Sequence, residues 1–317
     1  MDLSTSTECL NDETRTFQVY PQRFWILFLF VLLSFNQCMI WLTFSPIAGS
    51  AIEFFHIDEA TVDLLLNWGP IIFLPALPFT YLLLNTRHGL RKCVLIFAIV
   101  CLLAACLRLV PLLITSPTNS NFHDIALPFL HIGQILNAAT GPIAMGLVSQ
   151  LSCIWFAPNE RTRATTLAIL GACFGGAAGF LVPPFLVSQA DHVPRVLYLH
   201  VAQSFVACLL TLVYFPAQPP TPPSLAADML LNVNEVVKQR STETLKKVIY
   251  DVLHCFRNLS CVLVMISGSL MGGTFSAWGG LFANILTPLN YTQTEAGIQR
   301  IYLLTFTFNP RITYTLS

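Results

Sequence analysis

The stretch Phe24-Trp-Ile-Leu-Phe-Leu-Phe-Val-Leu-Leu-Ser-Phe-Asn-Gln-Cys-Met-Ile-Trp-Leu-Thr-Phe-Ser-Pro-Ile47 contains no charged residue. A helix needs about 20 apolar residues to cross the hydrocarbon core of a bilayer, and this stretch is long enough. Blocks of the same kind follow at Leu64–Leu84, Cys93–Ile114, Ile125–Trp155, Thr165–Val187, Val196–Phe215 and Leu259–Leu286. A further apolar stretch, Ile298–Phe308, is too short to span. The pattern predicts an all-α membrane protein with six spans, a polar loop, a seventh span and a partial eighth.

The composition agrees with a membrane protein. The chain is 55% hydrophobic and 10% charged, whereas a soluble domain carries about 25% charged residues. Its net charge of zero gives no basic footprint for nucleic acid. The polar N-terminal segment lacks the basic start and cleavage site of a signal peptide. The cysteines lie singly, most of them inside apolar blocks, and form no metal-ligand spacing, so we predict no metal and no cofactor.

Basic residues in the loops predict the orientation, because Lys and Arg gather on the cytosolic side. They occur in the N-terminal segment and in the second, fourth and sixth connections, at Arg15, Arg23, Arg87, Arg91, Lys92, Arg161, Arg163, Lys238, Arg240, Lys246, Lys247 and Arg257. The alternate connections are acidic. We therefore expect a cytosolic N-terminus. Asn290-Tyr-Thr292 is then a glycosylation sequon on the opposite face.

The layout of six spans, a loop and further spans resembles the major facilitator superfamily, in which two six-helix halves surround a midplane site. The loop Asn85-Thr-Arg-His-Gly-Leu-Arg-Lys92 resembles the cytosolic signature of that superfamily. Arg87, Gly89, Arg91 and Lys92 fit, and Thr86 stands where an Asp is usual. This departure puts in doubt any ion pair that relies on the carboxylate. The resemblance implies a gating role for Arg87, Gly89 and Arg91.

Longer strings narrow the resemblance to solute carrier family 49, which contains the feline leukaemia virus subgroup C receptor-type transporters, and especially to its lysosomal member. They are Asn67-Trp-Gly-Pro-Ile-Ile-Phe-Leu-Pro75, Gly133-Gln-Ile-Leu-Asn-Ala-Ala-Thr-Gly-Pro142, Trp155-Phe-Ala-Pro-Asn-Glu-Arg161 and Ile285-Leu-Thr-Pro288. The likeness stops after Gly297, and we read 298–317 as a divergent tail of a truncated form. The expected divisions are 1–23 (N-tail), 24–215 (six-helix bundle), 216–258 (Pro-rich, charged loop) and 259–297 (start of the second bundle).

Polar and aromatic side chains at membrane depth are the candidate solute contacts, since they are costly there and tend to face a cavity. The resemblance implies that Trp41 lines the cavity, and the alternative is a lipid-facing or interfacial tryptophan. Gln134 and Asn137 share one helical face, and the alternative for both is helix–helix hydrogen bonding. Weaker candidates are Asn67, Trp68 and Trp278.

Two residues inside the spans are further candidates for coupling or gating. His131 titrates near physiological pH, with a structural role as the alternative. Arg108 either holds an anionic group in the cavity or, as we expect from its position near the end of its span, snorkels to the interface.

The residues show no catalytic constellation, so we predict no enzyme. The resemblance implies alternating-access transport, with or without proton coupling, of a flat or cationic polar metabolite such as a vitamin B6-type pyridine or a choline-like amine. The alternatives are a non-transporting truncated or regulatory form and a haem exporter. The expected partners are a small solute and the lipid bilayer. Sorting adaptors could read Tyr250-Asp-Val-Leu253. The resemblance places the protein in a lysosomal or endosomal membrane.

Overall fold

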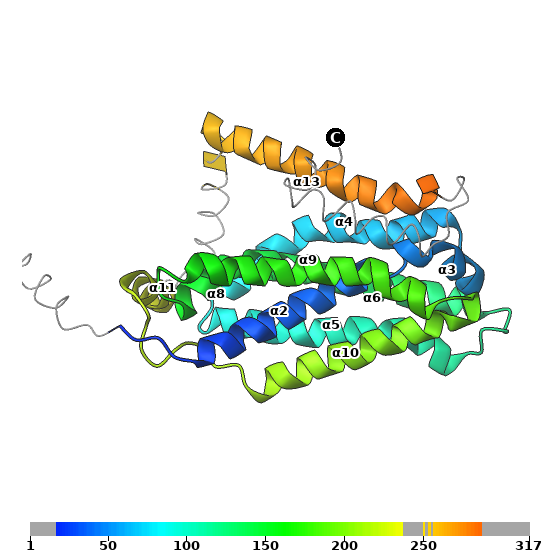
Figure 1. Ribbon diagram of the computed structural model, residues 1–317, viewed down its shortest axis with the longest axis horizontal. Coiled ribbons are helices and arrows are strands. Elements are labelled where there is room, and N and C mark those ends of the chain that lie inside the picture. The colour runs from blue at the N-terminus through cyan, green and yellow to red at the C-terminus, as the bar shows by residue number, and fades with distance from the viewer. Residues whose placement is uncertain (1–16, 237–249, 251–252, 255, 287–317) are drawn as a thin grey trace, which may run out of the picture.

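A computed structural model describes residues 17–236, 250, 253–254 and 256–286. Its helices are α2 (Gln22–Trp41), η1 (Ser45–Ile47), α3 (Ala48–Phe55), α4 (Glu59–Leu84), α5 (Gly89–Ile114), α6 (Phe122–Ala139), α7 (Gly141–Gly146), α8 (Val148–Trp155), α9 (Arg161–Leu186), η2 (Ala190–His192), α10 (Val193–Val213), α11 (Leu225–Val236) and α13 (Leu259–Leu286). This part of the chain contains no β-strand. The long helices lie side by side along the longest axis (Figure 1), and the predicted all-α membrane fold is confirmed.

Within the described residues, five helical segments are long and apolar enough to cross a membrane: Gln22–Phe55, Glu59–Leu84, Gly89–Ile114, Arg161–Leu186 and Ala190–Val213. The block Ile125–Trp155, predicted as one span, is divided among α6, α7 and α8. The first break, at Thr140, precedes Gly141-Pro142, where Pro142 has no N–H to donate to the carbonyl four residues earlier; the second break is at Leu147. Together with the five segments above, α6, α7 and α8 form the helical bundle.

The first predicted span, Phe24–Ile47, is also not one continuous helix. α2 ends at Trp41, and a 3₁₀ turn begins at Ser45. Pro46 explains the break, because it cannot donate the hydrogen bond that would continue the helix. The Thr43 hydroxyl caps the end by donating to the Ile40 carbonyl at 2.7 Å. The last turn of α2 thus lies inside the bundle.

α2 packs on α9 through glycines. A Cβ atom added at Gly171 would lie 2.8 Å from the Val31 side chain, and one at Gly179 would lie 3.2 Å from the Met39 carbonyl oxygen. At Gly175 an added Cβ would overlap the backbone of Phe35. Small residues at this four-residue spacing let two helix backbones touch.

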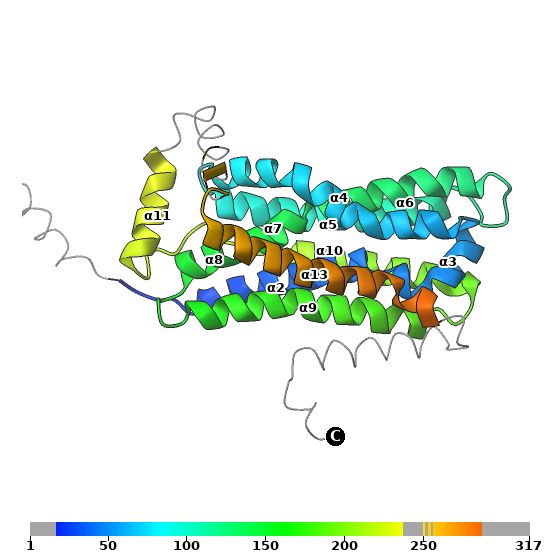
Figure 2. The ribbon, with the colours of Figure 1, turned by 90° about the horizontal axis from the view of Figure 1, so that it is seen from above.

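One end of the bundle, which we call the α11 end, is closed by the segment before α11. The Trp25 indole N–H donates to the Tyr214 carbonyl at 3.1 Å, and the Tyr20 hydroxyl lies 2.9 Å from that of Thr221. Arg161 donates to the Ser224 hydroxyl, which also accepts from the first turn of α11. α11 therefore lies across this end of the bundle (Figure 2).

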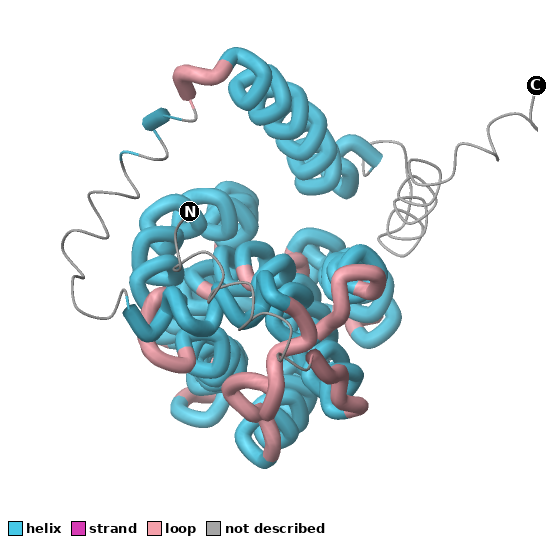
Figure 3. Tube along the Cα trace, turned by 90° about the vertical axis from the view of Figure 1, so that its left-hand side faces the viewer, coloured by secondary structure: helices cyan, strands magenta, loops and turns pink. Residues whose placement is uncertain are grey.

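α13 lies beside the bundle and outside it (Figure 3). Its described side chains, Leu259 to Thr274, are almost all exposed although most are apolar. The predicted stretch Ile298–Phe308 and the tail 298–317 lie outside the described residues.

Candidate functional site

Trp41 joins α2 to α4. Its indole N–H donates to the Leu66 carbonyl at 2.8 Å. That carbonyl lacks its helical partner because the residue four positions later is Pro70, which has no N–H. Gly69 gives the ring its space, since a Cβ there would lie 2.5 Å from the indole nitrogen. Trp41 is partly exposed, so it packs against α4 and still presents ring surface.

Gln134 and Asn137 face the end of α2 from α6, and both are buried. The Gln134 amide donates to the Trp41 carbonyl at 2.9 Å, and the Asn137 amide donates to the Gln37 carbonyl at 3.2 Å. These contacts match the helix–helix alternative considered for the pair. In this conformation the two side chains hold the backbone that carries Trp41.

Arg108 lies on α5 and is 1% exposed. The expectation that it snorkels to the interface is wrong, because its stem fits against Gly133 and its head turns inward. A Cβ at Gly133 would lie 2.6 Å from the Arg108 Cγ atom. The guanidinium donates to the Ile40 carbonyl at 3.2 Å and lies 4.6 Å from the centre of the Phe44 ring. Its positive charge therefore meets the negative end of the α2 dipole.

A second aromatic contact lies between α4 and α6. The Trp68 indole N–H donates to the His131 Nδ1 atom at 2.9 Å, and the rings meet edge to face with centroids 6.2 Å apart. Both side chains are partly exposed, and Asn67 beside them is exposed. Trp41 and His131 thus contact α4 two residues apart, at Leu66 and at Trp68, and we call this part of α2, α4 and α6 the aromatic wall.

The loop that resembles the superfamily signature lies at the α11 end, far along the bundle from that wall. Gly89 is required at the start of α5, because a Cβ there would overlap the Leu84 backbone. Arg87 and Arg91 are exposed. The Lys92 ammonium donates to the Thr86 hydroxyl at 3.2 Å. At this position the loop therefore has a hydrogen bond to a hydroxyl instead of an ion pair with the usual Asp.

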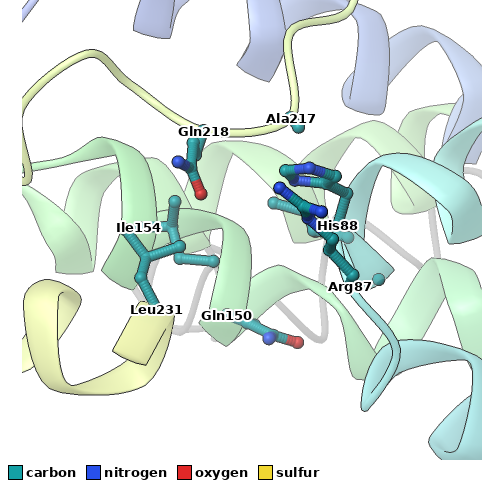
Figure 4. A pocket seen from close by; sticks show the side chains of 9 residues that line it. Arg87, His88, Gln150, Ile154, Ala217, Gln218 and Leu231 are labelled. Carbon is teal, nitrogen blue, oxygen red and sulfur yellow. The ribbon is translucent and has the colours of Figure 1, made fainter. Parts of the chain in front are cut away.

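Behind this loop is a cavity of about 30 Å³ (Figure 4), room for a water molecule or two. Arg87, His88, Gln150, Ile154, Ala217, Gln218 and Leu231 line it.

Other predicted sites cannot be placed. The side chain of Trp278 and the sequon at Asn290 lie outside the described residues. Tyr250 and Leu253 of the proposed sorting motif are both exposed, and the two residues between them are outside the described part. Within the described residues, no group of three or more His, Cys, Asp or Glu could hold a metal ion.

The comparisons with known proteins agree with this architecture. The sequence profile of the Major Facilitator Superfamily matches residues 26–310. The chain belongs to that superfamily. It is 33% identical over 299 residues to the solute carrier family 49 member 4 homolog of Xenopus tropicalis, covering 88% of the chain and 60% of the relative.

Other relatives of this chain carry functional names. It is 28% identical over 290 residues to the choline/ethanolamine transporter FLVCR1 of Felis catus, covering 87% of the chain and 48% of the relative. It is 29% identical over 300 residues to the choline/ethanolamine transporter flvcr2a of Danio rerio, covering 90% and 58%. The assignment to solute carrier family 49 is confirmed. The chain spans about three fifths of the length of the member 4 homolog.

Sequence reasoning missed several residues that shape the site. The paired roles of Gly69 and Pro70 could have been inferred, because a proline in a span frees a carbonyl and a neighbouring glycine gives access to it. His200 on α10, buried and with its Nδ1 atom 3.4 Å from the Thr43 hydroxyl, gave no periodic signal. Nor did the ion pair between Arg23 and Glu160, 3.1 Å apart, at the α11 end.

Proposed function

We propose that this chain forms the N-terminal wall of a membrane transporter for a small flat or cationic polar metabolite, working by alternating access. The observation that carries the proposal is the aromatic wall, where partly exposed Trp41 contacts α4 at Leu66 and partly exposed Trp68 contacts His131 on α6. Indole faces attract cations and stack on flat rings. Relatives named as choline/ethanolamine transporters support the cationic class.

In this proposal Trp41 and Trp68 contact the solute, and Asn67 offers a hydrogen bond. Gln134 and Asn137 contact it only when the end of α2 moves away and frees their amides. Trp278 contributes from α13 in the same proposal. A transporter site lies at the midplane between two repeats, and breaks in its helices are common there. The break after Trp41 fits that pattern.

The test is uptake of labelled choline and labelled pyridoxine by vesicles that carry the full chain. Trp41→Ala should lower the uptake at least tenfold, and Trp41→Phe should retain part of it because an aromatic face remains. Trp25→Ala is the matched control, since the Trp25 indole N–H also donates to a backbone carbonyl but lies at the α11 end. Equal losses for Trp41→Ala and Trp25→Ala would contradict the assignment. If neither solute enters through the unaltered chain, the non-transporting alternative gains support.

We propose His131 as the group that links transport to protons. Its Nδ1 atom accepts from Trp68, and a protonated imidazole cannot accept a hydrogen bond. Acidification would therefore release the Trp68 indole. The charged residues on α4 are Glu59 and Asp63, those on α5 are Arg91, Lys92 and Arg108, and α6 itself carries Asp124. His131→Gln should flatten the pH profile of uptake between pH 5 and 8; an unchanged profile would contradict the role.

We also propose that the α11 end is cytosolic and that the protein resides in a lysosomal or endosomal membrane. In support, Arg23, Arg161, Arg163 and the Arg87–Lys92 loop lie at helix ends on the α11 side, where the positive-inside rule predicts the cytosol. The connections at the other end carry Glu53, Asp58, Asp124 and Asp191. Antibody access to an N-terminal tag tests the orientation, since labelling of intact cells would contradict a cytosolic N-terminus; label confined to the cell surface after permeabilisation would contradict the lysosomal or endosomal placement.

A further inference from the structure

A groove lies between α2 and α9 near the α11 end of the bundle. Its volume is about 320 Å³, which is within the range of small-molecule sites, roughly 300–1,000 Å³. Gly171 forms part of its lining where the two helices touch, and contributes no side chain. The walls are apolar side chains of both helices: Phe24, Phe28 and Val31 of α2, and Leu167, Leu170 and Phe174 of α9.

The groove opens on the α10 side of the bundle. The Phe28 ring lies 5.7 Å from the Trp25 ring, whose N–H donates to the carbonyl that follows α10. On α9, Leu167 and Phe174 lie about half a turn around the helix from Thr165, which donates to Ser152 of α8. α13 lies on the side of the bundle opposite α10 (Figure 1). Phe28, Leu167 and Phe174 are 49%, 53% and 63% exposed, so no described part of the chain covers the groove and it faces the bilayer.

Arg163 lies in line with the groove, one turn of α9 nearer the α11 end. It precedes Leu167 by four residues and Leu170 by seven, the spacing that places side chains on one helical face. Arg163 is exposed and forms no salt bridge within the described residues. Glu160, the acidic residue just before α9, pairs with Arg23 at 3.1 Å. The first turn of α9 contains no acidic residue, so the charge of Arg163 adds to the positive end of the helix dipole.

We propose that this groove binds one acyl chain of an anionic phospholipid, with the lipid phosphate at Arg163. The guanidinium presents parallel N–H donors that suit a phosphate, and the apolar groove directly beyond it suits the chain. From Phe24 to Val31 the groove follows α2 for about 10 Å, roughly two thirds of the depth of one leaflet. A transmembrane helix would need a groove of about 30 Å, and a neutral sterol would leave Arg163 unpaired.

The lipid site does not depend on the solute that the protein carries. Anionic lipids are concentrated in the cytosolic leaflet, so the origin of the lipid in that leaflet rests on the orientation proposed above. Binding from detergent micelles tests the site without that orientation, because micelles reach both ends of the bundle.

The test is native mass spectrometry of the purified full chain in micelles that contain phosphatidylserine or phosphatidylcholine with identical acyl chains. The unaltered chain should retain phosphatidylserine about fivefold more tightly, the effect of one basic residue near an anionic headgroup. Arg163→Gln should abolish this preference, and Arg163→Lys should keep part of it. Arg195→Gln is the matched control, since Arg195 is also exposed and is also the third residue of its helix, α10, but lies at the other end of the bundle. It should keep the full preference.

A second variant tests the groove itself. Leu167→Trp places a larger ring at an exposed position of the lining, so the retention of both lipids should fall while the thermal midpoint without lipid stays unchanged. Ile169→Trp is the control, since Ile169 is equally exposed but does not line the groove. Equal retention of the two lipids by the unaltered chain, or a preference that survives in Arg163→Gln, would overturn the proposal. Displacement of phosphatidylserine by cholesterol would overturn it as well, in favour of a sterol.

Discussion

α2 meets its neighbours through two contrasting surfaces. Toward α9 the contact is made by glycines that touch the backbone of α2 at Val31, Phe35 and Met39. Toward α5 and α6 it is made by Arg108, Gln134 and Asn137, which donate to carbonyls in the last turn. The first surface is formed by close contact between the backbones of α2 and α9, so the two helices cannot move closer together there. The second is made of directional bonds that can be exchanged, so the difference identifies the polar side of α2 as the one suited to movement.

The largest expected effect comes from the glycine surface. Gly175→Ala places a Cβ against the backbone of Phe35, which cannot yield. Overpacking of this kind costs about 1–3 kcal/mol or more, so the thermal midpoint should fall strongly. Gly176→Ala is the control, since its added Cβ would lie 3.5 Å from the Leu42 Cδ1 atom, an ordinary contact. Equal midpoints for the two variants would break the comparison.

A smaller effect is expected on the polar surface. Gln134→Leu removes the donor to the Trp41 carbonyl, and Asn137→Leu removes the donor to the Gln37 carbonyl. Hydrogen bonds between membrane helices contribute about 0.6 kcal/mol on average and up to about 1.7. Each variant should therefore unfold a few degrees earlier in the same assay. A loss as large as that of Gly175→Ala would show that both surfaces are equally rigid.

Gly69→Ala sharpens the comparison at Trp41. The new Cβ would meet the indole nitrogen at 2.5 Å and push the ring off the Leu66 carbonyl. We expect the uptake of labelled choline or pyridoxine to fall with little change in the thermal midpoint, because only the partly buried hydrogen bond between Trp41 and Leu66 is lost. Gly146→Ala, which meets nothing within 4 Å, should behave as the unaltered chain. Unaltered uptake by Gly69→Ala would show that the position of the Trp41 ring does not matter for solute recognition.

The smallest effect concerns the N-terminus of α4, where neither surface is involved. The Thr61 hydroxyl and the Thr61 N–H both donate to the Asp58 carboxylate and lower its pKa below the usual value. A carboxylate with a lowered folded-state pKa stabilises at neutral pH, and this stabilisation is lost as the pH falls through that pKa. Asp58→Ala should lower the midpoint slightly at pH 7 and not at pH 3. Asp58→Asn should retain part of the cap, and an equal shift at both pH values would contradict this origin.

The length of the apolar blocks and the loop charges were enough to predict the helical bundle. The breaks after Trp41 and Thr140 were not predicted, although Pro46 and Pro142 mark them, because hydropathy averages over a whole span. The inward orientation of Arg108 also could not be predicted from the sequence and was seen only in the fold. Only the approach of Gly133 on another helix shows that the side chain turns inward rather than toward the interface.

The most direct test of the account is hydrogen exchange of the purified chain with and without saturating choline, repeated with pyridoxine. The account predicts that one of these solutes changes the exchange of amides from Ile40 to Ser45, at the end of α2 and the start of η1, and leaves Gly171 to Gly179 of α9 unchanged. A change confined to α9, or no change with either solute in a chain that folds normally, would contradict it.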